Sequence, residues 1–350
     1  MNKVIVIALF AIFSASFAKS ALAVSPLEAI YAARPDLQKA FDKTEQHEAI
    51  TGSAAGFLMN LEDWARQYGW QTHLELDMYK PVGTIPARLA KAGAQPKVTA
   101  AKYVVIDDAS GEILAANKAG EIWPIASITK LMTTGLALDS GLDVGGVGDV
   151  KMSDEVGGAR LNVVNGTKFM IRDLLAATLV GSANNAANAV ARLTGLSKTD
   201  FVTAMNARAT KLGLAQTQFV DPTGIELGNV STAREVAYFA KKAFDNENIR
   251  HFAGSSRIHL AALNDANYVR DIASTNWMLY NSAYDDFYVT AGKTGFLNES
   301  GWNAVVQLHP MSDKDARRSL TVVVLGAESR RASFDDVAAL AKSAWSNFSW

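Results

Sequence analysis

Ser127 and Lys130 are the pair of residues in this sequence best suited to do chemistry together. They stand three positions apart at the start of an apolar stretch that continues to Leu138, and a helix would place both side chains on one face. A serine hydroxyl becomes an effective nucleophile when a base removes its proton. A neutral lysine can be that base if burial or a neighbouring cation lowers its pKa from about 10.4. The pair therefore indicates a serine hydrolase that uses lysine as its base.

Two later segments, Ser182-Ala183-Asn184 and Lys293-Thr294-Gly295, supply groups that such a site needs. Lys293 could be the cation that lowers the pKa of Lys130. A helix that begins at Ser127 would also direct its first backbone N–H groups toward negative charge that develops near the hydroxyl. We therefore expect the three segments to meet in one active site.

Each of these short motifs predicts little when it stands alone. Ser16-Phe17-Ala18-Lys19 repeats the serine–lysine spacing near the N-terminus, and Ser274-Thr275-Asn276 repeats the second motif. Order and context make the prediction stronger. The first motif opens an expected helix after an expected hairpin, the second lies between two expected helices, and the third ends an expected strand.

The composition excludes several other kinds of site. The 350 residues include no cysteine, which rules out disulfides, thiolate catalysis and cysteine metal ligands. The five histidines show no spacing typical of a metal site and do not support a Ser-His-Asp triad, so we expect neither a metal nor a cofactor. The formal net charge of -1 gives no support to a nucleic-acid partner.

The N-terminus has the pattern of an export signal. Lys3 precedes an apolar run from Val4 to Phe17, which is short for a transmembrane helix, and Ala21-Leu22-Ala23 is a small-residue cleavage site. We expect residues 1–23 to be a signal peptide, with an uncleaved anchor as the alternative. The mature chain would then be an exported, soluble, periplasmic protein.

Residues 24–98 differ in sequence pattern from the rest of the chain. We expect them to form a small N-terminal extension of helices and a strand, which ends in a proline-containing linker over 80–98. This extension could contact another envelope protein. The remaining residues, 99–350, would form the catalytic domain.

The hydrophobic pattern of the catalytic domain predicts strands at both ends and helices between them. Expected strands cover 103–106, 112–116, 287–290, 303–308 and 320–325, and expected helices cover 127–138, 171–180, 184–193, 198–212, 233–244 and 333–348. Residues 141–148 are glycine-rich and are expected to be a connection. This order favours an α/β protein of the α+β type, in which helices cover both faces of a five-stranded antiparallel sheet.

The chain resembles the serine D-alanyl-D-alanine carboxypeptidases and endopeptidases, the low-molecular-mass penicillin-binding proteins. The resemblance covers about residues 101–345 and includes the three motifs in order, IASITKLMT, IRDLLAATLVGSANNAANAVA, STAREVA and GKTGF followed by GWN. It implies a fold like that of β-lactamases and transpeptidases. It also implies peptidoglycan stem peptides as substrates and β-lactam antibiotics as covalent inhibitors.

The resemblance also implies roles for individual residues. Ser127 would be the acylated nucleophile, Lys130 its base, and Ser182 the relay of a proton to the leaving amine. Asn184, Lys293, Thr294, Gly295 and Phe296 would bind substrate, with the N–H groups of Ser127 and Phe296 as the oxyanion hole. Arg330 and Arg331 are the two candidates for binding the substrate carboxylate. Asp221, in the sequence DPTGI, is interpreted as a turn residue and not as a catalytic acid.

Several functions remain open on the sequence alone. The main prediction is a D-Ala-D-Ala carboxypeptidase, and the alternative is an endopeptidase that cleaves cross-links. The C-terminal segment AKSAWSNFSW is a poor match to the amphipathic anchor of family carboxypeptidases, which keeps the endopeptidase open. A class A β-lactamase is disfavoured because residues 210–230 lack its ExxxN pattern. A non-catalytic envelope scaffold is disfavoured because all three motifs are intact.

Overall fold

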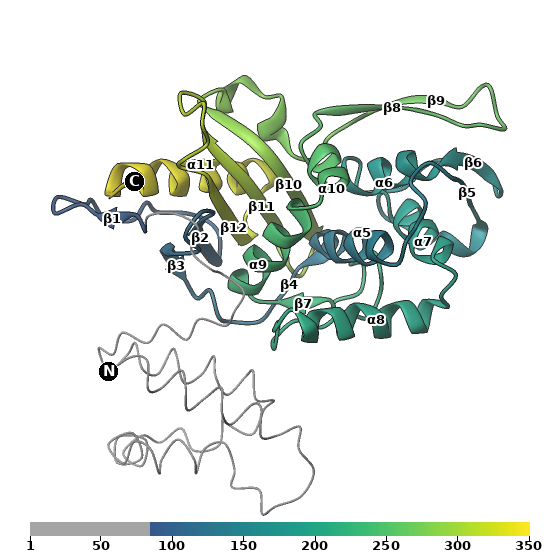
Figure 1. The fold of residues 1–350 in the computed structure, drawn as a ribbon, viewed down its shortest axis with the longest axis horizontal. Coiled ribbons are helices and arrows are strands. Elements are labelled where there is room, and N and C mark those ends of the chain that lie inside the picture. Colours follow the sequence, from purple (N-terminus) through teal and green to yellow (C-terminus); the bar gives the residue numbers. More distant parts are fainter. Residues whose placement is uncertain (1–84) are drawn as a thin grey trace, which may run out of the picture. The chain divides into compact units, whose positions relative to one another are not determined.

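A five-stranded antiparallel sheet is the centre of residues 85–350, the part of the chain that the computed structural model describes (Figure 1). The strands follow the order β10-β11-β12-β2-β3, so the hairpin of β2 and β3 joins the sheet through β2, which pairs with β12. Their bounds are Phe287–Leu297 for β10, Gly301–Pro310 for β11, Leu320–Ala327 for β12, Lys102–Asp107 for β2 and Ile113–Asn117 for β3. The predicted five-stranded antiparallel sheet is confirmed.

Helices cover the two faces of this sheet, as the apolar pattern of its strands requires. Val322 and Val324 of β12 pack with Phe334 of α11 (Arg330–Asn347). Val323 points to the opposite face and is fully buried as well. There α9 (Ala233–Phe244) packs against β2 and β12, and Figure 1 shows α9 and α11 on opposite sides of the sheet.

A second, mainly helical region lies beside β10 and has its own apolar core. Its helices are α5 (Thr129–Asp139), α6 (Ile171–Leu179), α7 (Asn184–Leu193), α8 (Lys198–Lys211) and α10 (Glu247–Ala253). Side-chain oxygens cap the N-termini of helices in both regions. The Ser197 side chain accepts from Asp200 N–H at the start of α8, and the Thr232 side chain accepts from Glu235 N–H at the start of α9. The active-site segments lie where this region meets the sheet.

Short elements complete the described part of the chain. The paired strands are β1 (Ala87–Arg88) with β13 (Phe348–Ser349), β4 (Trp123–Pro124) with β7 (Val230–Ser231), β5 (Val147–Val150) with β6 (Thr167–Met170), and β8 (Arg257–Ala261) with β9 (Val269–Ala273). The 3-10 helices are η2 (Ala126–Ile128), η3 (Met152–Asp154), η4 (Trp277–Leu279) and η5 (Ser282–Tyr284).

Three local predictions are wrong. The strand expected to end before Lys293 continues to Leu297, because β11 pairs with it along this whole length, including Phe296 opposite Trp302. Two glycines, which are rare in strands, hide this extension in the sequence. Part of the glycine-rich segment 141–148 belongs to β5. The α-helix expected from Ser127 begins at Thr129, after the turn of η2.

The predicted signal peptide, residues 1–23, and the predicted extension up to residue 84 lie outside the described residues. Part of the predicted linker contacts the C-terminal end of α11. Leu89 N–H donates to Asn347 O over 2.9 Å, and Gly93 N–H donates to Asn347 Oδ1 over 2.6 Å. Within residues 85–350, no helix is long and apolar enough to cross a membrane.

Candidate active site

Ser127 lies in the turn of η2, between the short strand β4 and the helix α5. Ala126 precedes it with a left-handed backbone, at a φ of 50°, a conformation that is unfavourable for any residue with a Cβ. Ser127 itself is half-buried. The turn presents its hydroxyl beside the first residues of α5, where Lys130 is fully buried.

Lys130 Nζ contacts three oxygen atoms. It lies 2.8 Å from Ser127 Oγ, 2.7 Å from Asn184 Oδ1 and 2.6 Å from the carbonyl oxygen of Thr223. The last two atoms can only accept hydrogen bonds. A neutral amine has two N–H groups, which these oxygens satisfy, and its lone pair then faces the hydroxyl of Ser127. The geometry therefore suits lysine as a base for this serine.

The electrostatic surroundings favour the neutral form of Lys130. Burial, followed by the nearby charge of Lys293, holds the pKa of Lys130 well below its usual value. Asp221 opposes this shift more weakly. Burial also lowers the pKa of Lys293 to about 7. The charge of Lys293 thus helps to lower the pKa of Lys130, which assigns the charge of the pair to Lys293.

Lys293 and Ser182 form the second polar contact of the site. Lys293 Nζ donates to Ser182 Oγ and to the carbonyl of Thr294, each over 2.9 Å. Ser182 stands between α6 and α7 with a φ of 59°. A left-handed serine costs about 1–2 kcal/mol, and such strain is often found at functional sites. The predicted second and third motifs thus meet in the structure.

Asn184 joins the nucleophile to the loop before β6. Its Oδ1 accepts from Lys130, its Nδ2 donates to Gly157 O over 2.8 Å, and its backbone N–H donates to Ala159 O over 2.6 Å. Gly158 leaves the space that this contact needs, because a Cβ there would lie 2.7 Å from Asn184 Nδ2. The loop around residues 157–159 is therefore part of the site.

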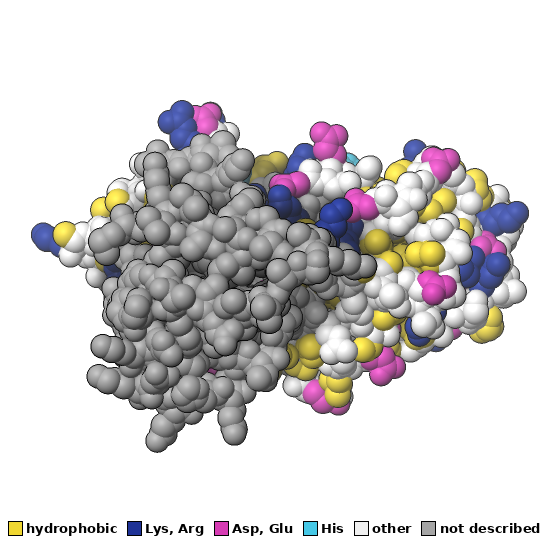
Figure 2. Space-filling model, turned by 60° about the horizontal axis from the view of Figure 1, so that its bottom comes forward, with side chains coloured by type: hydrophobic (Ala, Val, Ile, Leu, Met, Phe, Trp, Pro, Cys, Tyr) yellow, Lys and Arg dark blue, Asp and Glu magenta, His cyan; other side chains and the backbone are white. Residues whose placement is uncertain are grey.

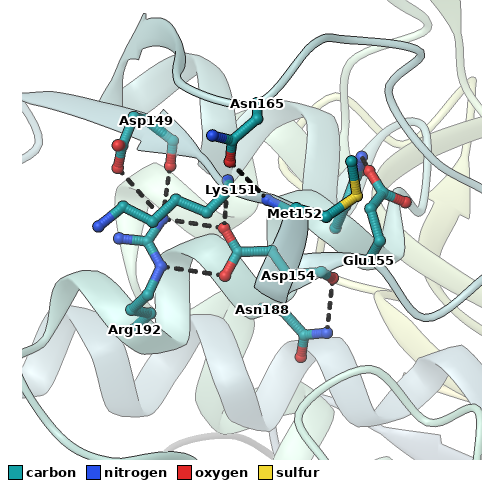
Figure 3. A network of polar contacts seen from close by, with 9 residues as sticks. Asp149, Lys151, Met152, Asp154, Glu155, Asn165, Asn188 and Arg192 are labelled. Atoms are coloured by element: carbon teal, nitrogen blue, oxygen red, sulfur yellow. Dashed lines mark hydrogen bonds and ion pairs between the residues drawn. The ribbon is translucent and has the colours of Figure 1, made fainter.

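One face of α7 binds the segment 149–155, which leads into this loop (Figure 3). Arg192 donates to both carboxylate oxygens of Asp154, over 3.0 and 2.9 Å, and to the carbonyl of Asp149 over 2.7 Å. Asn188 Nδ2 donates to Asp154 O over 2.9 Å. Asn185 adds bonds to the backbone of Leu161 and to Glu155. The helix that begins at Asn184 thus fixes the segment that contacts Asn184.

The sequence interpretation missed the catalytic-site role of the loop at Thr223. Its carbonyl accepts from Lys130, and the neighbouring carbonyl of Pro222 accepts from Thr133 over 2.6 Å. Gly224, with a φ of 81°, allows this approach, since a Cβ there would lie 1.9 Å from Ala126 O. The signal for this loop was present in DPTG, a turn sequence with glycine where a left-handed backbone occurs.

Asp221 shapes this loop from within, as its interpretation as a turn residue predicted. Its carboxylate accepts from the N–H groups of Thr223, Gly224 and Glu226 over 2.6, 2.9 and 3.0 Å. It also accepts from the side chains of Thr223 and Asn229. Burial raises the pKa of Asp221, but these hydrogen bonds outweigh burial and leave the pKa below its usual value.

β10 contacts the turn of the nucleophile at Gly295. A Cβ at this position would lie 2.6 Å from Ile125 O and 3.0 Å from the backbone nitrogen of Ser127. The N–H of Ser127 therefore lies next to the strand that continues to Phe296. Phe296 is 43% exposed and stacks on Trp302 at 4.2 Å between ring centroids. This placement is compatible with the predicted oxyanion hole.

The two candidate arginines differ in their surroundings. Arg330 is half-buried, and its guanidinium lies over the rings of Trp302 at 4.8 Å and Trp277 at 5.4 Å. Arg331 is exposed and pairs with Asp335 over 3.4 Å. The two rings hold the guanidinium of Arg330, whereas the guanidinium of Arg331 already pairs with a carboxylate, so Arg330 is the better candidate.

The described residues show no arrangement that suggests a metal centre. Within 85–350, no group of three or more histidine, aspartate or glutamate side chains is placed to hold a metal ion. His259 forms an exposed pair with Asp271 at 2.9 Å, and His309 stacks on Tyr288.

Comparisons with known proteins show the family to which the chain belongs. A family model described as D-alanyl-D-alanine carboxypeptidase matches residues 89–329. A D-alanyl-D-alanine endopeptidase of Pseudomonas aeruginosa is 31% identical over 76% of this chain and 84% of its own length. A D-alanyl-D-alanine carboxypeptidase of Bacillus subtilis is 31% identical over 56% of this chain and 51% of its own length. The crystal structure of the DD-transpeptidase of Streptomyces K15 matches the fold with a TM-score of 0.66 and 23% identity, over 73% of this chain and 100% of its own.

Proposed function

Because the chain belongs to the D-alanyl-D-alanine carboxypeptidase family of serine peptidases, we propose that it hydrolyses D-alanyl peptide bonds of peptidoglycan through an acyl-enzyme on Ser127. The observation that carries the proposal is the set of contacts of Lys130. Its Nζ lies 2.8 Å from Ser127 Oγ, and carbonyl oxygens occupy its other two directions. The neutral amine is thus placed to remove the hydroxyl proton.

The acylation step follows from this geometry. Lys130 takes the proton of Ser127, and Ser127 Oγ attacks the carbonyl carbon of the D-alanine residue. The N–H groups of Ser127 and Phe296 would stabilise the oxyanion of the tetrahedral intermediate. The C–N bond then breaks, and the leaving amine takes up the proton that Lys130 had removed, relayed by Ser182, which returns Lys130 to its neutral form. Ser182 is suited to this task because Lys293 donates to its hydroxyl oxygen over 2.9 Å.

Water completes the cycle by attack on the acyl-enzyme. Lys130, neutral again and within reach of Ser127 Oγ, takes a proton from the attacking water and passes it to Ser127 Oγ as the acyl C–O bond breaks. In this way one base serves both half-reactions. The product is a stem peptide that ends in a free D-alanine carboxylate, and the serine returns to its starting state.

Thr294 and Arg330 are proposed to bind the carboxylate of the leaving D-amino acid. Thr294 follows Lys293 directly on β10, at the edge of the sheet that adjoins the nucleophile. Arg330 lies over Trp302, the cross-strand partner of Phe296. A cation and a hydroxyl at the same end of the site are typical of carboxylate recognition.

Two reactions of this class remain as candidates. The carboxypeptidase reaction releases the terminal D-alanine of a stem peptide, and the endopeptidase reaction cleaves the bond between cross-linked stems. The extent of similarity favours the second, since it covers 84% of the Pseudomonas endopeptidase and 51% of the Bacillus carboxypeptidase. Digestion of purified sacculi separates them. Loss of cross-linked dimers identifies an endopeptidase, and release of free D-alanine alone identifies a carboxypeptidase.

β-Lactams are proposed to acylate Ser127 and to remain bound. A class A β-lactamase needs a carboxylate that activates the deacylating water. In residues 210–230, Asp221 accepts five hydrogen bonds from its own loop, and Glu226 is exposed. Neither carboxylate is placed for that task, which supports a peptidase over a β-lactamase. Rapid turnover of a chromogenic cephalosporin would contradict this proposal.

Export to the periplasm is proposed from the N-terminal sequence alone. Residues 1–23 would be removed as a signal peptide, 24–98 would form the extension, and 99–350 would form the catalytic domain. N-terminal sequencing of the protein recovered from a periplasmic extract tests this proposal, with Val24 expected as the first residue. Recovery of the uncleaved chain in the membrane fraction would contradict it.

A further inference from the structure

Ser274-Thr275-Asn276, the repeat of the second motif, lies between the two segments that carry the second and third motifs. Thr275 N–H donates over 3.0 Å to the carbonyl of Val180, which precedes Ser182 by two residues. On its other side, Thr275 Oγ1 lies 2.7 Å from Thr294 Oγ1 and accepts its hydrogen bond. The segment therefore connects the backbone before Ser182 with a side chain proposed to bind substrate.

Buried neighbours fix the position of Thr275. Ser274 and Asn276 are 7% and 2% exposed. Ser274 N–H donates to Ser256 O over 2.8 Å, and Asn276 N–H donates to Ser274 Oγ over 3.1 Å. Asn276 Oδ1 accepts from Met278 N–H at the start of η4. These contacts hold both flanking residues and leave Thr275 little freedom to move away from Thr294.

The side chain of Asn276 lies so close to β10 that residue 292 of this strand must be a glycine. A Cβ at Gly292 would lie 2.6 Å from Asn276 Nδ2. This close approach keeps the segment against β10 at the position just before Lys293. The distance between the hydroxyls of Thr275 and Thr294 is thus set by backbone packing on both sides.

We infer that Thr275 is a positioning residue that prepares the hydroxyl of Thr294 for the terminal carboxylate of the substrate. The inference rests on the proposed function, in which Thr294 binds that carboxylate. A threonine hydroxyl has one proton to donate. In the structure the proton of Thr294 is directed to Thr275, which holds the hydroxyl in a defined orientation.

A carboxylate changes the direction of this hydrogen bond. It can only accept, so the proton of Thr294 turns toward it. Thr275 can then donate its own proton to Thr294 Oγ1, which keeps that oxygen satisfied. Hydrogen bonds in such a chain polarise one another, and the bond to the carboxylate becomes stronger. A neutral amide at the same place would gain much less from this chain than a charged carboxylate.

The test compares Thr275→Val, which removes the hydroxyl and keeps the shape, with Thr275→Ser, which keeps the hydroxyl. The substrates are an N-acylated D-alanyl-D-alanine peptide and the same peptide with a terminal carboxamide. For the carboxylate peptide we expect Thr275→Val to lower kcat/KM about three- to tenfold, mainly through KM. For the carboxamide we expect almost no change, and Thr275→Ser should behave like the wild type with both.

Other outcomes overturn the inference in ways that can be told apart. An equal loss on both peptides, or a loss that Thr275→Ser does not restore, would show a merely structural role. On the carboxylate peptide, the double variant Thr275→Val with Thr294→Val should lose no more kcat/KM than Thr294→Val alone. Additive losses would show that Thr275 does not act through Thr294. If the Val variant does not fold, Thr275→Ala is compared in the same way. If the wild type hydrolyses neither these peptides nor a cross-linked dimer, the proposed function fails and not this inference alone.

Discussion

Lys130 Nζ lies 2.8 Å from Ser127 Oγ, and its two remaining contacts are carbonyl oxygens of Asn184 and Thr223. This relationship decides the protonation state that the site can use. A protonated lysine would donate to all three oxygens, and Ser127 would keep its proton. A neutral lysine donates to the two carbonyls and accepts from Ser127. The contacts therefore suit a neutral lysine, and burial together with Lys293 shifts the pKa of Lys130 in that direction.

Acylation of Ser127 should have a bell-shaped dependence on pH. The rate should rise as Lys130 loses its proton, at a pH well below the usual pKa of lysine because burial and Lys293 lower its pKa. The rate should fall again as Lys293 loses its charge, with a pKa of about 7. Stopped-flow acylation by a fluorescent penicillin measures both limbs. Lys293→Arg, which stays charged, should remove the alkaline decline if it folds. A rate that rises steadily to pH 10 would contradict the assignment.

Stability should increase with pH in the alkaline range because of the same lysines. Burial lowers the pKa of Lys293 to about 7 in the folded state, whereas the unfolded chain keeps a value near 10.4. Between these values the unfolded state binds more protons, so the free energy of unfolding rises by up to about 1.4 kcal/mol per pH unit for this group. Urea denaturation at pH 7 and pH 9 should show a smaller rise for Lys293→Met. The control is Lys342→Met, at an exposed lysine, which should show the same rise in the free energy of unfolding as the wild type. An equally reduced rise in both variants would contradict the prediction.

Gly224→Ala should damage both folding and catalysis. The backbone at Gly224 has a φ of 81°, and a Cβ would lie 1.9 Å from Ala126 O. Gly166 has the same φ, and no atom lies within 4 Å of its Cβ position. Gly166→Ala should therefore cost only the strain of a left-handed alanine, about 1–2 kcal/mol.

The difference between the two glycine variants isolates the contact with the nucleophile turn. Gly224→Ala should have the lower melting temperature and the slower acylation by penicillin, because the loop that carries Thr223 must move away from Lys130. Equal melting temperatures for the two variants would show that the turn accommodates the extra carbon.

Arg192→Met should loosen the loop that contacts Asn184. Arg192 donates to both oxygens of Asp154, whose side chain is 3% exposed. Removal of the guanidinium leaves this carboxylate buried without its cation, which should cost about 3 kcal/mol in the free energy of unfolding. Arg331→Met is the matched control, because its ion pair with Asp335 is exposed and should contribute less than about 1 kcal/mol. Urea denaturation compares the two, and similar losses would contradict a special role for Arg192.

Much of the fold could be predicted because its elements follow simple patterns. The bounds of α7 and α9 agree with the sequence prediction, since an alanine-rich run and a threonine cap define them. The extent of β10 could not be predicted. Gly292 and Gly295 are unfavourable in a strand, and only their tight contacts with Asn276 and with the nucleophile turn explain why they stand there.

In the site, too, some residues could be predicted from the sequence and others could not. The side chains of Ser127, Lys130, Ser182 and Lys293 could be predicted, and the structure brings all four together. The carbonyl of Thr223 could not be predicted, because every residue has a carbonyl and only the fold decides which one reaches Lys130. The contact of Thr275 with Thr294 is hidden for a similar reason, since a repeated short motif does not say which neighbours it will have.

Covalent labelling by a fluorescent penicillin tests the central claim most directly. The wild type should gain one label per chain, and peptide mass spectrometry should place it on Ser127. Ser127→Ala should gain none, although its folded stability should stay within about 1 kcal/mol of the wild type for a half-buried hydroxyl. A wild type that takes no label, or a Ser127→Ala variant that is labelled as well as the wild type, would contradict the assignment of Ser127 as the acylated nucleophile.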